Sequence, residues 1–191
     1  MSKTLFYKGK TMRNYITTYT KKHFDVLNPQ EDEIDINDIA HALTMITRAG
    51  GHFSKFYSVA QHCVCCALEA VERGYSNRVA LACLLHDGSE AYMSDLVRPL
   101  KSSFPDYLAV EEKLQNMIYR KFLGGDLTPE EREQVSLVDD AMLFHEFRYY
   151  MNEELEVKDQ TLLSKPVFVT KDFDDVEEEY LKWFYRLLKL Q

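Results

Sequence analysis

Apolar residues recur at helical spacing along most of the chain from residue 36 onward. In the segment 36–48 they fall at the first, fourth, eighth and eleventh positions, which is the stripe of an amphipathic helix. His41, Thr44 and Arg48 fall together on a different face of this predicted helix. The same spacing predicts further helices over 58–73, 78–92, 105–123, 129–150 and 174–189. The pattern therefore predicts a compact all-α bundle.

Start and stop signals separate these segments. Ser58 with Gln61, and Thr128 with Glu131, form capping boxes, and Asn77 is expected to cap the third helix. Glycines that can end helices stand at positions 50, 51, 74, 124 and 125. We therefore expect short connections between neighbouring helices.

Residues 1–33 have a different pattern. The stretch 15–29 mixes aromatic and β-branched residues and then breaks at Asn28–Pro29, which is typical of one or two short strands or an extended arm. We expect this arm (1–33) to belong to the same domain as the helical part, residues 34–191.

Composition narrows the classes of function. The chain has 191 residues, enough for one domain with a substantial core, and a net charge of −8. That charge argues against binding to nucleic acid or a membrane surface, which needs a basic face, but not against a small anion held by a few cations. No apolar run approaches the ~20 residues that cross a bilayer, and no secretory signal is evident, so the expected compartment is the cytoplasm.

The four cysteines at 63, 65, 66 and 83 all fall within predicted helices. They have no second pair at zinc-site spacing, so we interpret them as small buried residues of a reducing compartment.

A histidine and a carboxylate stand together where the pattern predicts core. His86 and Asp87 end the apolar run ALACLLHD, and burying an ionised carboxylate there is costly unless a cation compensates. Imidazole with carboxylate suits Mn, Fe, Co, Ni or Zn rather than Ca, and Mg also stays open. The sequence thus favours one divalent metal ion of undetermined identity.

Two other positions can complete such a site. His62 lies in the first turn of the preceding helix, and helices joined by a short loop pack antiparallel, so His62 and His86 can meet. Asp139 and Asp140 interrupt the apolar fifth helix, so one of them should face inward. Two histidines and two aspartates leave coordination positions for water and substrate, as in catalytic metal sites.

The arrangement resembles the HD-domain metal-dependent phosphohydrolase superfamily, and especially the single-domain bacterial and phage 5′-deoxynucleotidases. The motif H-x₂₃-HD-x₂-E-x₄-D-x₃-P is intact over 58–101, and the resemblance spans 36–150. It implies four metal ligands: His62, His86, Asp87 and Asp140. Asp139 is the alternative fourth ligand, and helix phase does not choose between the two aspartates. No histidine lies between Asp87 and Asp140, which favours a single metal.

The resemblance also implies proton transfer and water activation by Glu90 and Asp95, and a carboxylate beside a metal-bound water is suited to both. Their simpler interpretations are an exposed helix-end glutamate and a turn cap. Arg48, fourteen residues before His62, matches a phosphate-binding arginine, whose fork of donors suits phosphate oxygens. Further cationic or donor candidates near the mouth are His52, Lys55, Arg98 and Lys101.

The similar deoxynucleotidases carry a tryptophan after that arginine, where this chain has Ala49, so the preference for 2′-deoxyribose stays open. The aromatic residues of FSKFYS (53–58) are an alternative stacking surface. The leading hypothesis is a phosphomonoesterase acting on nucleoside or deoxynucleoside 5′-monophosphates. Its alternatives are a dNTP triphosphohydrolase at the same site and an inactive nucleotide-binding module. The C-terminal helix containing Trp183 is compatible with a homodimer.

Overall fold

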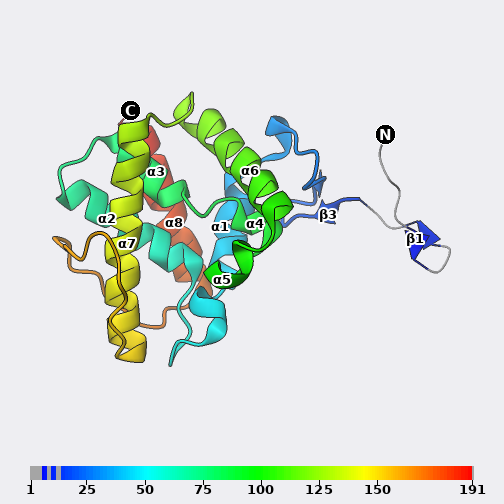
Figure 1. The fold of residues 1–191 in the computed structure, drawn as a ribbon. Helices are drawn as coiled ribbons and strands as arrows, with labels where there is room; N and C mark the ends of the chain where they lie inside the picture. Colours follow the sequence, from blue (N-terminus) through cyan, green and yellow to red (C-terminus); the bar gives the residue numbers. More distant parts are fainter. Residues whose placement is uncertain (1–5, 8–9, 12–13, 191) are drawn as a thin grey trace.

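The computed structural model of the protein describes residues 6–7, 10–11 and 14–190, and it confirms an all-α bundle with a strand-like N-terminal arm (Figure 1). The helices are α1 (Ile36–Met45), α2 (Val59–Glu72), α3 (Asn77–Leu85), α4 (Glu90–Met93), α5 (Arg98–Lys101), α6 (Pro105–Leu123), α7 (Pro129–Met151) and α8 (Phe173–Leu188). Two 3₁₀ turns precede and follow α1: η1 (Glu31–Glu33) and η2 (Arg48–Gly51).

Helix α3 lies at the centre of the core. Every residue from Val79 to Leu85 is buried, because α2, α6, α7 and α8 all pack against this helix. A helix that is apolar on all sides needs such enclosure. The Tyr180 hydroxyl of α8 donates to the carbonyl of Leu84 at 2.8 Å, which satisfies one buried polar group of this contact.

Both predicted capping boxes are present, at Ser58 with Gln61 and at Thr128 with Glu131. The cap of α3 is Ser76 rather than Asn77: the Ser76 side chain accepts a hydrogen bond from the Val79 amide at 3.2 Å.

Two predicted helices end earlier than expected. Helix α1 stops at Met45, because Thr47 pairs with Ser58 and the Arg48 amide then donates to the Tyr57 carbonyl at 2.9 Å. Arg48 consequently lies in η2 rather than on a helical face shared with His41, which instead contacts Glu177 on α8 at 2.8 Å.

The segment expected to be one helix over 78–92 is interrupted after Leu85, and α4 begins only at Glu90. Gly88 lies in the turn between them. A Cβ on this residue would be 2.9 Å from the Leu85 carbonyl oxygen and 3.2 Å from Ile118 Cδ1, so the turn leaves no room for a side chain.

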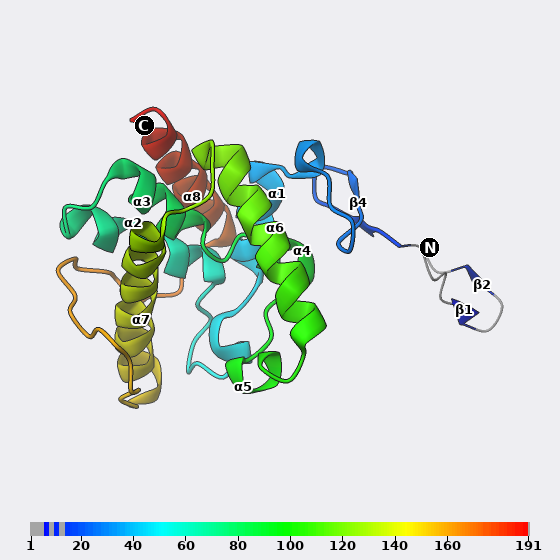
Figure 2. The same cartoon turned by 45° about the horizontal axis from the view of Figure 1, so that its top comes forward.

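Residues 152–172, which we call the strap, form neither helix nor strand, contrary to the expectation of short connections. Buried Glu69 of α2 holds the strap by accepting hydrogen bonds from the amides of Leu163 and Ser164. Arg73 adds an ion pair with Asp159 at 2.7 Å. In Figures 1 and 2 the strap (orange) lies on the α2 and α7 side of the molecule, away from α6.

The arm forms two small antiparallel hairpins, β1 (Phe6–Tyr7) with β2 (Lys10–Thr11) and β3 (Ile16–Thr17) with β4 (His23–Phe24). Phe24 is buried in the main core and stacks on Tyr92 of α4 at 4.1 Å, so this part of the arm joins the helical core. The β1–β2 hairpin lies away from the helices in both views (Figure 2). None of the helices in the described part of the chain is long and apolar enough to cross a membrane.

Candidate metal and phosphate site

Two histidines and two aspartates meet where α2, α3 and α7 pack together. His62 Nε2 lies 3.2 Å from His86 Nε2 and 3.1 Å from Asp139 Oδ1. Asp87 Oδ2 lies 3.3 Å from His86 Nε2 and 3.9 Å from His62 Nε2. Donors bound about 2.1 Å from one ion stand roughly 3.0–3.4 Å apart in octahedral or tetrahedral geometry, so the separations of 3.1, 3.2 and 3.3 Å fit a shared cation, and the pair at 3.9 Å is wider.

The orientation of the two imidazoles supports the same conclusion. His86 Nδ1 lies 2.7 Å from the carbonyl oxygen of Cys83, which only accepts, so this nitrogen carries the proton. In a neutral ring, Nε2 of His86 then carries a lone pair, which faces the carboxylates of Asp87 and Asp139 and the Nε2 atom of His62. His62 Nδ1 likewise lies 2.7 Å from a carboxylate oxygen, that of Glu146. A shared proton or a metal ion between the two Nε2 atoms is therefore favourable.

The pKa shifts within the cluster also indicate that positive charge is favourable there. Burial opposes protonation of His86, yet the carboxylate of Asp87 and other neighbours raise its pKa well above the usual value. Burial also opposes ionisation of Asp139, but its hydrogen bonds with His62 and His86 hold its pKa well below the usual range. Asp87 Oδ2 is a buried carboxylate oxygen without a hydrogen-bond partner among the described residues. These groups favour an added cation.

Cysteines surround the cluster and enlarge the set of potential metal ligands. His62, Cys66 and His86 place donor atoms within 4.8 Å of one another, and so do Cys63, His86 and Asp87. Burial raises the pKa of the Cys63 thiol to about 11. Because a thiol must lose its proton to bind a metal, the imidazoles and carboxylates are the better donors at neutral pH. The predicted burial of the cysteines is confirmed for Cys63, Cys66 and Cys83.

The fourth member of the cluster is Asp139, the alternative to Asp140 that helix phase left open, so the preference for Asp140 was wrong. Only Asp139 reaches the histidines, because adjacent residues on a helix point about 100° apart and α7 turns its Asp139 face toward α2 and α3.

Arg48 lies beside the cluster, with its side chain only 12% exposed. Its Nη1 is 3.6 Å from Asp87 Oδ2, and its Nε is 3.4 Å from Glu146 Oε2. Glu146 of α7 is fully buried and was not among the residues expected from the sequence.

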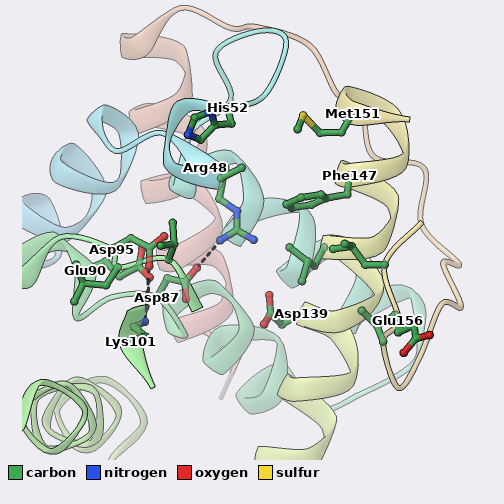
Figure 3. Close-up of a pocket in the computed structure, with 16 residues that line it drawn as sticks. Arg48, His52, Asp87, Glu90, Asp95, Lys101, Asp139, Phe147, Met151 and Glu156 are labelled. Atoms are coloured by element: carbon green, nitrogen blue, oxygen red, sulfur yellow. Dashed lines mark ion pairs between the residues drawn. The ribbon is translucent and has the colours of Figure 1, made fainter. Parts of the chain in front are cut away.

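A cavity of about 670 Å³ opens over the cluster and has two chemically different sides (Figure 3). One side is polar and is formed by Arg48, Asp87, Glu90, Asp95, Lys101 and Asp139. The other is mainly apolar and is formed by residues of α7 and the strap: Leu143, Phe147, Met151, Leu155 and Val157. The cavity therefore suits a molecule with an anionic end and an apolar or aromatic end.

Glu90, Asp95 and Lys101 lie together on the polar side, as expected. Lys101 Nζ is 4.0 Å from Glu90 Oε1 and 3.8 Å from Asp95 Oδ1, and it also pairs with Glu111 at 2.6 Å. Burial and the charges of Asp87 and Asp95 raise the pKa of Glu90 to about 10. Glu90 is thus a buried carboxyl that can hold a proton at neutral pH.

The remaining candidates have different positions. His52 lines the cavity, as expected. Lys55 is exposed and is not among the described lining residues. Arg98 begins α5, and its side chain lies outside the described residues.

The aromatic stretch 53–58 does not supply the stacking surface. Phe53 is buried behind the cavity wall, where it contacts Phe147 edge-on at 5.2 Å. Ala49 and Phe147 both line the cavity, and Phe147 of α7 is the aromatic side chain that faces it.

Fold and site together define a helical protein with a buried histidine–aspartate cluster below a cavity. No protein-family model matches the chain. It is 41% identical over 135 residues to the uncharacterized protein YfdR of Escherichia coli, covering 71% of each chain. It is 30% identical over 106 residues to the uncharacterized protein RCAP_rcc00048 of Rhodobacter capsulatus, covering 53% of this chain and 54% of that protein. The chain belongs to the family of YfdR.

Proposed function

We propose that this protein is a metal-dependent phosphohydrolase of the HD-domain type that hydrolyses nucleoside or deoxynucleoside 5′-monophosphates. The observation that carries the proposal is the cluster of His62, His86, Asp87 and Asp139. Four pairs of their donor atoms lie 3.1–3.9 Å apart, and the cluster lies beside Arg48 and beneath the cavity.

The four side chains of the cluster would hold one divalent ion. An ion of this kind supplies a water of lowered pKa and neutralises charge that develops on a phosphoryl group. Four protein ligands leave coordination positions for water and substrate when the ion takes five or six ligands. The protein's part is to orient the donors, which the contacts of both Nδ1 atoms already do.

Arg48 would bind the phosphate. Its Nη1 edge faces Asp87 and the cavity, and a guanidinium presents paired donors that match phosphate oxygens. Glu90 would hold a proton and give it to the leaving 5′-oxygen, since its raised pKa keeps it protonated at neutral pH. The charge of Lys101 partly offsets the rise in the Glu90 pKa, and Lys101 Nζ also lies 3.8 Å from Asp95 Oδ1.

The charge of the cavity favours monophosphates over triphosphates. Among its described lining residues, five carry carboxylates and only two are lysine or arginine: Asp87, Glu90, Asp95, Asp139 and Glu156, against Arg48 and Lys101. With Glu90 protonated and a divalent ion bound, the lining and the ion have no excess positive charge to offset the two further negative charges of a triphosphate, so a dianionic monophosphate is favoured.

The apolar side of the cavity would hold the rest of the substrate. Leu143, Phe147 and Met151 lie one helical turn apart along α7 and face the cavity. An aromatic ring that stacks on an apolar wall gains stability without hydrogen bonds to its edge. A nucleobase fits this description, with weak discrimination among bases expected.

The test is phosphate release from a panel of ribonucleotides and deoxyribonucleotides, each as mono- and triphosphate. Each is assayed with Mn²⁺, Co²⁺, Mg²⁺ or Zn²⁺ after removal of bound metal. We expect release of inorganic phosphate from 5′-monophosphates with at least one metal, and none from the His86→Ala variant. Release of tripolyphosphate from dNTPs would support the triphosphohydrolase instead. Tight nucleotide binding without hydrolysis under every metal would identify a binding module.

A further inference from the structure

Glu146 connects the two halves of the candidate site. It lies on α7 seven residues after Asp139, which is two helical turns along the same face. Its side chain is 0% exposed, and both of its carboxylate oxygens have partners. Oε1 is 2.7 Å from His62 Nδ1, whereas Oε2 is 3.4 Å from Arg48 Nε and 3.5 Å from Arg48 Nη2.

We propose that Glu146 is a positioning residue that sets both the metal affinity, through His62, and the phosphate affinity, through Arg48. The phosphate part rests on the proposed function, because that function assigns phosphate binding to Arg48. The metal part stands on the contacts of His62 alone.

The effect on His62 follows from its tautomer. An imidazole that donates its Nδ1 hydrogen to a carboxylate keeps the lone pair on Nε2 and becomes a stronger ligand. Nε2 of His62 is the atom that lies 3.1 Å from Asp139 and 3.2 Å from His86. Glu146 therefore directs the lone pair toward the donors of the cluster. Loss of such an outer partner costs about 10–100-fold in metal affinity.

The effect on Arg48 follows from competition between two carboxylates. Asp87 lies 3.6 Å from Nη1, and Glu146 holds the Nε and Nη2 side of the same guanidinium. Without Glu146, the guanidinium is free to turn fully onto Asp87, which lowers its availability to phosphate and draws Asp87 away from the cluster. Glu146 thus holds Arg48 where one edge stays open to the cavity.

The experiment compares Glu146→Gln with the wild-type protein. Glutamine keeps the size of the side chain but carries no charge. We expect the dissociation constant for Co²⁺, followed by its visible absorption, to rise about 10–100-fold. At saturating Co²⁺ we further expect the dissociation constant of inorganic phosphate, measured by calorimetry, to rise about 10-fold, because a charge-assisted contact that fixes Arg48 is lost. A residue that merely supported the fold would leave the second value unchanged.

Glu177→Gln is the matched control, because Glu177 also places a carboxylate 2.8 Å from a histidine Nδ1, that of His41, far from the cluster. It should leave both constants within twofold of wild type. If Glu146→Gln does not fold, Glu146→Asp keeps the charge but shortens the side chain, and it should weaken Co²⁺ binding by a smaller factor. Unchanged Co²⁺ and phosphate affinities in a folded Glu146 variant would overturn the inference, whereas absence of Co²⁺ binding by the wild type would overturn the proposed function itself.

Discussion

Neutralising one of the adjacent aspartates Asp139 and Asp140 should distinguish them sharply. Asp139 Oδ1 lies 3.1 Å from His62 Nε2 and 3.6 Å from His86 Nε2, so Asp139→Asn removes a charged ligand from the cluster while keeping its shape. Outer partners of metal ligands are worth about 10–100-fold in affinity, so a direct ligand should cost at least that, or at least about 1.4–2.8 kcal/mol. Asp140→Asn should change metal affinity less than twofold.

The assay is calorimetric titration of each metal-free variant with Mn²⁺ and Co²⁺, with the metal content of the purified proteins as a second measurement. The neighbouring substitution is a close control, because both variants lose one negative charge at almost the same place on α7. A general electrostatic effect of the protein's charge of −8 would therefore weaken both alike.

The result that would refute the reasoning is a large loss in Asp140→Asn with none in Asp139→Asn. It would mean that α7 turns toward α2 and α3 a face about 100° away from the one that carries Asp139. The same rotation would remove Glu146 from His62, because Asp139 and Glu146 share a face, so the two experiments check each other.

Three further predictions concern the turn at Gly88, the bound metal ion and the carboxyl group of Glu90. Gly88→Ala should lose about 1–3 kcal/mol in urea unfolding and weaken metal binding, since its Cβ would be 2.9 Å from the Leu85 carbonyl, whereas Gly125→Ala, with nothing within 4 Å, should change neither. Chelation should lower the melting temperature by about 8–16 °C, because metal at 1,000 times its Kd adds about 4.1 kcal/mol and each kcal/mol is worth about 2–4 °C here; an unchanged melting curve would argue against a bound ion. With chelator present, the free energy of unfolding should fall as the pH rises from about 4.3, the unfolded pKa of a glutamate, to about 10, the raised pKa of Glu90. In this range Glu90 is ionised in the unfolded chain but protonated in the folded one, so each rise in pH favours unfolding. The free energy of unfolding of Glu90→Gln should fall less steeply with pH.

The helices were predictable because their signals are local. Capping boxes such as Ser58 with Gln61 satisfy backbone amides of the first turn, and this requirement does not depend on the rest of the fold. The meeting of His62 with His86 was predictable for a similar reason. A short connection of residues 73–76 leaves α2 and α3 few ways to pack other than side by side.

The path of the chain around Arg48 was less predictable. Glycines 50 and 51 indicated a helix end, but the turn begins earlier, with Ala49 at a φ of 52°. The pairing of Thr47 with Ser58 imposes this early end, and it joins residues eleven positions apart. The spacing of apolar residues carries no information about such a bridge, so the prediction that His41 and Arg48 share a helical face was wrong. Arg48 nevertheless lines the cavity.

Glu146 was missed because α7 is surrounded on more than one side. The helix packs against α2 and α3, and the cavity, the strap and the aromatic group around Tyr150 adjoin it as well, so polar residues of several faces are buried and no single stripe stands out. A signal was nevertheless present. Asp139 and Glu146 are seven residues apart, so a face that places the first beside the histidines also buries the second. A carboxylate there needs donors, and a histidine that binds metal through Nε2 needs an acceptor at Nδ1. Each group thus meets a requirement of the other, and a search of metal-binding helices for a second acid at this spacing would have identified it.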